Sequence, residues 1–168
     1  MRRVLLTGMS GAGKSTLTAA LAARGYRAID LDCAEYSEWR SVAPSDTTPG
    51  TPVEATRDWV WREDRVRELL RDESAQTLFV SGTASNMRLF LPDFDAVVLL
   101  SAPAEVLAQR LGKRGHGEYG SRPAELQRVL ELVRSVEPLL RRASTHELDT
   151  RASIDDVVRA ITTIAGGA

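Results

Sequence analysis

The sequence predicts an α/β fold of three layers, in which helices cover both faces of a five-stranded parallel sheet. Short apolar runs rich in Val, Ile and Leu alternate with longer segments of helical periodicity along most of the 168 residues. Such runs are typical of strands that are buried on both faces, and their alternation with helices favours a parallel sheet. The length suits one domain, so we expect a single unit over residues 1–168.

Five apolar runs are the expected strands, and the fifth has the weakest pattern: residues 4–7, 28–31, 78–81, 96–101 and 146–149. Apolar residues recur mostly at helical spacing in five further segments, which we expect to be helices: residues 15–23, 54–71, 104–111, 123–142 and 154–164. Prolines and glycines interrupt these patterns at 41–53 and 112–121, where we expect surface loops.

The charge and cysteine content narrow the class of protein. The chain carries 22 basic and 23 acidic side chains and has a pI near 6.2, which excludes a general electrostatic attraction to nucleic acid or an anionic membrane. No apolar stretch reaches the roughly 18 residues that indicate a membrane span. Cys33 is the single cysteine, and the first residues lack a secretory pattern. We therefore expect a cytoplasmic monomer or homodimer whose partners are small molecules.

Residues 8–15 read Gly-Met-Ser-Gly-Ala-Gly-Lys-Ser and lie between an expected strand and an expected helix. This pattern in this context is specific for a phosphate-binding loop, because glycines let backbone N–H groups surround a phosphate. We expect Lys14 to bridge the β- and γ-phosphates and Ser15 to coordinate Mg²⁺. The cofactors predicted are thus ATP and Mg²⁺. The expected nucleotide-binding residues of this segment are Gly8, Ser10, Gly11, Ala12, Gly13, Lys14, Ser15 and Thr16.

With this loop near its start, the chain resembles the small P-loop kinases, the group that holds shikimate, gluconate, adenylate and dephospho-coenzyme A kinases. The length fits that group, and the chain lacks the Asn-Lys-x-Asp signature of guanine-specific proteins. The resemblance covers nearly the whole chain and implies the three-layer P-loop NTPase fold. It further implies an acceptor-binding insert at about residues 33–73 and a lid at about 112–122.

Two carboxylates, Asp30 and Asp32, end the second expected strand. Residues two apart on a strand point the same way, so both face the region opposite the phosphate loop. The resemblance implies that one of them, Asp30, lies near Mg²⁺ and that Asp32 serves the acceptor hydroxyl, as a base or by orienting it. The alternative is that both carboxylates cap a helix that begins near Cys33.

The expected acceptor site combines the insert with the end of the third strand. That strand ends in Ser81, Gly82 and Thr83 without the acidic residue that many P-loop proteins carry there, and ligands of such folds bind at this edge of the sheet. From the insert we expect Arg57 and Trp61 to contact the acceptor. Trp59 falls at helical spacing with apolar neighbours and is expected in the core.

The resemblance places arginines of the lid over the transferring phosphoryl group, where their charge stabilises the transition state on closure. Arg110 and Arg114 are the residues at the matching positions. The segment around Thr150 resembles the loop that packs against adenine in these kinases. A purely solvated role for either arginine remains an alternative.

We therefore expect an ATP-dependent kinase that transfers the γ-phosphate of Mg·ATP to a small acceptor, most simply at a hydroxyl. The expected catalytic residues are Lys14, Asp32, Arg110 and Arg114. A nucleoside or nucleotide kinase is one alternative. The other is a nucleotide-binding regulator or slow ATPase, which would not need the second carboxylate.

Overall fold

A computed structural model describes residues 1–43, 54, 56–113, 115 and 122–167. Five parallel strands form one sheet in the order β2-β5-β1-β6-β7. These strands are β1 (Arg2–Thr7), β2 (Arg27–Asp30), β5 (Thr77–Ser81), β6 (Ala96–Ser101) and β7 (His146–Asp149). The predicted five-stranded parallel sheet is confirmed, including its weakest strand.

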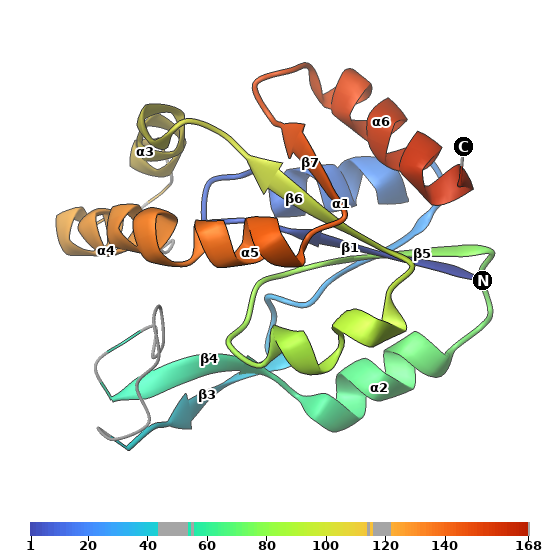
Figure 1. The fold of residues 1–168 in the computed structure, drawn as a ribbon, viewed down its shortest axis with the longest axis horizontal. Coiled ribbons are helices and arrows are strands. Elements are labelled where there is room, and N and C mark those ends of the chain that lie inside the picture. The colour runs from blue at the N-terminus through green and yellow to red at the C-terminus, as the bar shows by residue number, and fades with distance from the viewer. Residues whose placement is uncertain (44–53, 55, 114, 116–121, 168) are drawn as a thin grey trace.

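Helices cover both faces of this sheet and give the predicted three layers (Figure 1). On one face lie α1 (Lys14–Ala22) and α6 (Ile154–Gly166), which contact each other and the strands beneath. The opposite side carries α2 (Glu63–Arg71), the 3₁₀ helices η1 (Met87–Leu89) and η2 (Leu91–Asp93), and α5 (Glu137–Ala143). α4 (Pro123–Ser135) lies next to α5, and α3 (Ala104–Gly112) lies next to α4.

The two central strands explain why the chain adopts this arrangement. Val4, Leu5 and Leu6 of β1 have no exposed surface, and Val97 to Leu100 of β6 are equally enclosed. A strand with apolar side chains on both faces is stable only where helices cover both, at about 25 cal/mol per Å² of apolar surface removed from water. The core therefore lies along β1 and β6, and the strand ends are free to carry polar groups.

The insert differs from the prediction. Residues 57–61 form a strand, β4 (Arg57–Trp61), which pairs antiparallel with β3 (Ser37–Ser41), and the helix begins only at Glu63. The expected helix over 54–71 is thus wrong in its first half. Val and Trp both favour β-strands, and Val60 and Trp61 are buried in this one. Their packing in the tertiary structure therefore outweighs the helical spacing of the apolar residues. Residues 44–53 and 55 lie outside the described part.

The expected helix over 123–142 is two helices. α4 ends at Ser135 and α5 begins at Glu137, with Pro138 in the first turn of α5. Proline has no backbone N–H and its ring collides with the carbonyl four residues earlier, so a continuous helix would be broken here, whereas a first turn tolerates it. The segment that was expected to be one helix is therefore divided at this proline.

Asn86 joins the insert to the main sheet. Its side-chain oxygen accepts a hydrogen bond of 2.9 Å from the Trp61 backbone N–H, and its amide nitrogen donates one of 2.9 Å to the Trp61 carbonyl. The Ser85 backbone N–H donates to the Trp59 carbonyl at 3.3 Å. Asn86 thereby imitates a neighbouring strand and fixes the hairpin β3-β4 beside the segment that follows β5.

Replacing this side chain tests its structural role. Asn86→Ala leaves both backbone groups of Trp61 without their partner, so we expect the free energy of unfolding to fall by about 1–3 kcal/mol. Urea unfolding followed by circular dichroism measures the change. Gln127→Ala, at an exposed position of α4, is the control and should be near neutral. An equally small effect of Asn86→Ala would contradict the clamp.

Candidate active site

The phosphate loop joins β1 to α1 and is seated closely on the neighbouring strand. A Cβ atom at Gly8 would lie 2.4 Å from the Leu100 carbonyl oxygen, and the φ of Gly8 is 152°, a conformation that other residues rarely adopt. At Gly11 a Cβ would meet the Leu107 carbonyl at 3.2 Å with a φ of 86°. Both glycines are therefore required by the backbone, as a loop that surrounds a phosphate demands.

Lys14 lies folded over this loop. Its ammonium donates a hydrogen bond of 2.8 Å to the Gly8 carbonyl and lies 3.9 Å from Oδ2 of Asp32. Only 11% of its side chain is exposed. The charge is thus held between the loop and the carboxyl end of β2, beside the position that the loop geometry gives to phosphate oxygens.

Ser15 and Asp30 form the second polar pair. The Ser15 hydroxyl donates to Oδ2 of Asp30 at 2.7 Å, and Oδ1 of Asp30 accepts from the Asp32 backbone N–H at 3.0 Å. A hydroxyl and a carboxylate are hard oxygen ligands that suit Mg²⁺. No group of three or more His, Cys, Asp and Glu side chains that could hold a metal occurs within the described residues. The residues therefore fit a Mg²⁺ ion that takes its remaining ligands from phosphates and water.

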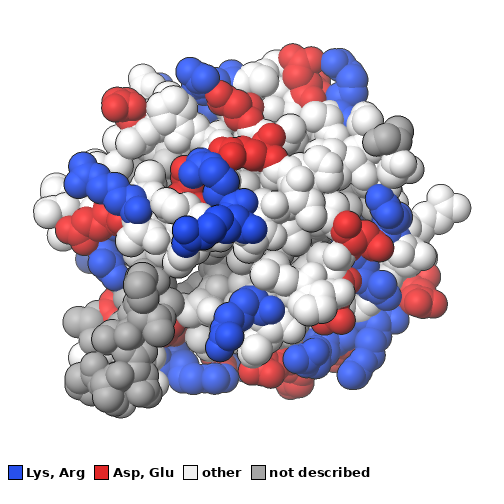
Figure 2. Space-filling view, in the orientation of Figure 1, with Lys and Arg blue, Asp and Glu red and all other residues white. Residues whose placement is uncertain are grey.

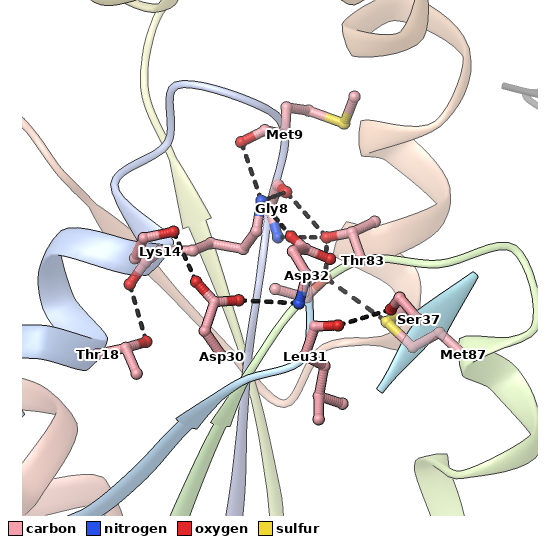
Figure 3. A network of polar contacts seen from close by, with 12 residues as sticks. Gly8, Met9, Lys14, Thr18, Asp30, Leu31, Asp32, Ser37, Thr83 and Met87 are labelled. Carbon is pink, nitrogen blue, oxygen red and sulfur yellow. Dashed lines mark hydrogen bonds and ion pairs between the residues drawn. The ribbon is translucent and has the colours of Figure 1, made fainter. Parts of the chain in front are cut away.

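Asp32 lies opposite the loop. Lys14 and Thr83 both donate to the Gly8 carbonyl there, and Asp30 accepts from the Asp32 backbone N–H (Figure 3). Burial raises the pKa of its carboxyl group above the ordinary value of 3.8, and the negative charge of Asp30 adds to the rise. The Lys14 charge and hydrogen bonds from the Thr83 backbone and the Trp59 side chain oppose that rise in pKa. A third of the side chain, 33%, stays accessible. Asp32 is thus an oriented carboxylate with an open side and an increased proton affinity.

Thr83 ties the end of β5 to the phosphate loop. Its hydroxyl donates to the Gly8 carbonyl at 2.9 Å, lies 2.9 Å from the Thr7 hydroxyl and 3.3 Å from the Gly8 backbone nitrogen. Of the Ser81-Gly82-Thr83 segment predicted to bind the acceptor, only Thr83 lines the cavity described next. Ser81 is buried, and Gly82 packs against Leu31 and Trp61.

A cavity of about 730 Å³ opens from the phosphate loop towards the hairpin and α5. Asp32, Lys14 and Thr83 lie at its polar end. The remaining wall consists mainly of apolar and aromatic side chains: Met9, Trp39, Trp59, Met87, Leu91, Leu132, Val136, Leu139, Leu140 and Ala143. The volume is in the range of pockets for small-molecule ligands.

The structure reverses the expected placement of the two tryptophans of β4. Trp61 is fully buried and packs against Phe90, whereas Trp59 lines the cavity and contacts Asp32. The distinction rested on helical spacing, and alternate residues of a strand face opposite sides. Arg57 lies outside the cavity wall, where it pairs with Glu54 and stacks over Trp39 at 4.4 Å.

Arg110 and Thr150 meet on the other side of the phosphate loop. The Arg110 guanidinium donates to the Gly11 carbonyl at 3.1 Å and to the Thr150 carbonyl at 2.6 Å. Together with Gly13 and Thr16 they line a second cavity of about 380 Å³. Arg110 therefore joins two loops beside the nucleotide end of the site. Arg114, the other expected lid residue, lies outside the described residues, as do 116–121.

Sequence reasoning missed the contribution of α4 and α5. Leu132, Val136 and Leu139 lie in the segment expected to be one helix, and none of them was predicted to line a site, yet all three line the cavity. For Leu139 the available signal is Pro138, since a proline in this segment marks a break in the helix. Arg88 of η1, which also lines the cavity, carries no sequence signal of its own.

Comparisons with known proteins agree with this geometry. A family model described as an AAA domain matches residues 4–131, which is more than half of the chain, and the chain belongs to this family. No curated protein matches it in sequence. Within the described part of the chain, every helix is too short or too polar to traverse a bilayer.

Several solved kinases share the fold. Shikimate kinase from Acinetobacter baumannii, in complex with shikimate, has a TM-score of 0.64 at 20% identity, over 98% of this chain and 92% of that one. A sugar kinase from Janibacter sp. HTCC2649 has a TM-score of 0.54 at 20% identity, over 97% and 93%. Deoxyadenosine kinase from M. mycoides with bound dATP has 0.54 at 16%, over 96% and 97%. The predicted fold of the small P-loop kinases is confirmed. These kinases are named for different acceptors, so the acceptor of this chain has to be argued from the residues of its own site.

Because the pKa of Asp32 is raised in the folded protein, the free energy of unfolding should depend on the ionisation of this side chain. A carboxyl group with a higher pKa in the folded state destabilises the fold when ionised; the penalty is absent below the unfolded pKa and develops as pH rises through the folded pKa. Asp32→Asn removes this penalty. We expect its free energy of unfolding, relative to wild type, to increase as pH rises above the ordinary carboxyl pKa of 3.8.

Denaturant unfolding at several pH values measures this difference. Glu73→Gln, which neutralises a carboxylate with 77% exposure, is the control and should change stability by less than about 0.5 kcal/mol throughout. A relative stability of Asp32→Asn that declines with rising pH would show that the ionised carboxylate stabilises the fold.

Proposed function

We propose that the protein is an ATP-dependent kinase that transfers the γ-phosphoryl group of Mg·ATP to a hydroxyl group of a small acceptor. The observation that carries this proposal is Asp32, an accessible carboxylate of raised pKa that faces both the phosphate loop and a cavity of about 730 Å³. A protein that only binds or hydrolyses a nucleotide has no need of an oriented carboxylate at the polar end of a mainly apolar cavity.

In the proposed reaction the acceptor oxygen attacks the γ-phosphorus, and the bond to the oxygen that bridges the β- and γ-phosphorus atoms breaks. ADP leaves with the electron pair of that bond, and Asp32 takes the proton of the acceptor hydroxyl. A pKa nearer neutrality makes a carboxylate a better proton acceptor at physiological pH, provided that it stays ionised. Hydrogen bonds from the Thr83 backbone and Trp59 hold Asp32 in place for this step.

The phosphate loop would hold the triphosphate. In the nucleotide-bound protein Lys14 exchanges its contact with the Gly8 carbonyl for phosphate oxygens, where its charge offsets the charge that develops in the transition state. Ser15 and Asp30 would hold Mg²⁺, whose chemistry here is to neutralise and orient the β- and γ-phosphates. Gly8, Ser10, Gly11, Ala12 and Gly13 supply the backbone that surrounds the phosphates.

The second cavity would hold the rest of the nucleotide. Thr16, Arg110 and Thr150 lie around it, and Arg110 bonds to both the Gly11 and Thr150 loops. Binding there would place the planar guanidinium of Arg110 beside the base. Arg114, which lies outside the described residues, would stabilise the transferring phosphoryl group from a closing lid.

The proposal separates two effects of Asp32. Because Asp32 acts on the acceptor, Asp32→Asn should lower acceptor-dependent ADP formation by about 10²- to 10⁴-fold, the usual contribution of a general base. The same substitution should change the affinity for Mg·ATP by less than about threefold, since the Asp32 carboxylate meets the Lys14 ammonium at 3.9 Å, beyond hydrogen-bond distance. Coupled-enzyme assays and equilibrium titration with a non-hydrolysable ATP analogue measure the two quantities.

Lys14→Ala is the matched control, because it should abolish nucleotide affinity and turnover together. A nucleotide-binding regulator would differ from the kinase in two ways. Its rate of ATP hydrolysis would not change when an acceptor is added, and it would not change in Asp32→Asn. That result would exclude the kinase.

Replacing Asp30 tests the metal site. Asp30→Asn removes the carboxylate that accepts from Ser15, so the Mg²⁺ concentration for half-maximal ATP binding should rise by about tenfold. Titration with Mg²⁺ at fixed nucleotide concentration measures it, with Asp93→Asn on η2 as the control. An unchanged Mg²⁺ requirement in Asp30→Asn would remove this residue from the metal site.

A further inference from the structure

The walls of the larger cavity differ sharply in chemistry from its floor, and the difference bears on the acceptor of the proposed kinase. On one side lie Trp39 and Trp59 of the hairpin, whose ring centroids are 5.1 Å apart at 60°. The same cavity is lined by Leu132 of α4, Leu139 of α5 and Val136 between them, and these helices lie across from the hairpin in Figure 1. Two apolar walls of this kind accommodate a flat apolar body between them.

Two of these apolar side chains are more exposed to solvent than is usual for Trp and Leu. Trp39 is 40% exposed and Leu139 is 39% exposed, although both belong to the cavity wall. Apolar side chains that gather around a concave surface mark a ligand site, since a ligand removes their surface from water. At about 25 cal/mol per Å², covering them favours an apolar ligand over a polar one.

The polar side chains of the described lining are distributed differently. Most lie at the floor, where the loop, Asp32 and Thr83 would meet one hydroxyl and the γ-phosphate. A sugar or linear polyol would press most of its other hydroxyls against the Leu side chains and the faces of the Trp rings, which offer no hydrogen-bond acceptor. Burying each such hydroxyl without a hydrogen bond disfavours binding, so the described walls disfavour polyhydroxylated acceptors.

Arg88 supplies one further feature. It lies in η1 on the cavity wall, is exposed, and forms no hydrogen bond or ion pair with any residue of the described segments. Lys14 is the other cation on that wall, and it is held by Gly8 and Asp32. An unpartnered guanidinium beside an apolar slot is complementary to a single carboxylate or phosphate.

We infer that the acceptor combines a flat, apolar ring with one hydroxyl group and one anionic group. The ring would lie between the tryptophans of the hairpin and the α4-α5 wall, with the hydroxyl at Asp32 and the anion at Arg88. This inference rests on the proposed kinase function for its hydroxyl. Apart from Trp59, the residues that specify the ring and the anion take no part in the proposed phosphoryl transfer.

The test compares probes that differ in one feature at a time. Para-hydroxymethylbenzoate carries the ring, the hydroxyl and the anion; benzyl alcohol lacks the anion; gluconate keeps the anion but replaces the ring with a polyol. Two measurements are made for each probe on the full chain: ADP formation with Mg·ATP, and quenching of tryptophan fluorescence without nucleotide. We expect the benzoate to give the highest kcat/KM and the strongest quenching.

Variants assign each feature to its residue. Arg88→Gln should lower the affinity for para-hydroxymethylbenzoate by about tenfold and that for benzyl alcohol by less than about twofold, because only the former loses a charge-assisted bond. Leu139→Asp should weaken both by about tenfold through the loss of apolar contact, and repulsion of the anion should add to the loss for para-hydroxymethylbenzoate. Arg71→Gln and Leu89→Asp, which change exposed side chains outside the cavity, are the matched controls and should leave both affinities unchanged.

The outcomes separate this inference from the kinase function. Stronger turnover with gluconate than with the benzoate overturns the inference and leaves the kinase intact. Quenching by the benzoate that Arg88→Gln weakens, without any stimulated ADP formation, supports the inferred ligand class and overturns the kinase. Absence of both quenching and turnover with the benzoate overturns the inference.

Discussion

The close seating of the phosphate loop on the ends of β5 and β6 is the constraint on which the rest of the site depends. Gly8 approaches the Leu100 carbonyl so closely that no Cβ fits between them, and the Thr83 hydroxyl bonds to the Gly8 carbonyl from the other side. The loop cannot shift without losing the Thr83 hydrogen bond or colliding with the Leu100 carbonyl. Its backbone is therefore preorganised for an anion before any nucleotide binds.

The same seating fixes the electrostatics. Lys14 reaches across the loop towards Asp32, and Asp30 bonds at once to Ser15 and to the backbone of Asp32. Positive and negative groups alternate over a few ångströms, so each carboxylate has a defined neighbour. Charge elsewhere plays a smaller part: Figure 2 shows basic and acidic side chains interspersed over one face, consistent with the near balance of 22 and 23.

The sequence was sufficient to predict the parts whose chemistry is local. The phosphate loop, the buried strands and the Asp30-Asp32 pair follow from spacing and composition, because a strand buried on both faces and a loop around a phosphate each restrict which residues can occur. The hairpin could not be predicted in this way. Arg57 to Trp61 fits a helical pattern in isolation, and only pairing with Ser37 to Ser41 and the Asn86 clamp make it a strand.

The larger cavity was the least predictable part, because separate regions of the chain build it. Trp59 comes from the hairpin, Arg88 from η1 and Leu139 from α5, and their proximity is a property of the tertiary fold. A stripe of leucines on a helix has the same pattern whether it faces a core or a cavity. The helix break at Pro138 was the available hint, and it marks a boundary without showing what the next helix faces.

The most direct test of the central claim is a pH profile of acceptor-stimulated kcat/KM, measured on the wild-type protein together with its affinity for Mg·ATP at each pH. If Asp32 accepts the proton, kcat/KM falls on the acid side as this carboxylate becomes protonated, with an apparent pKa above 3.8, while the nucleotide affinity does not follow it. If both quantities fall together, or kcat/KM shows no acid limb above that value, the carboxylate is not the acceptor's base.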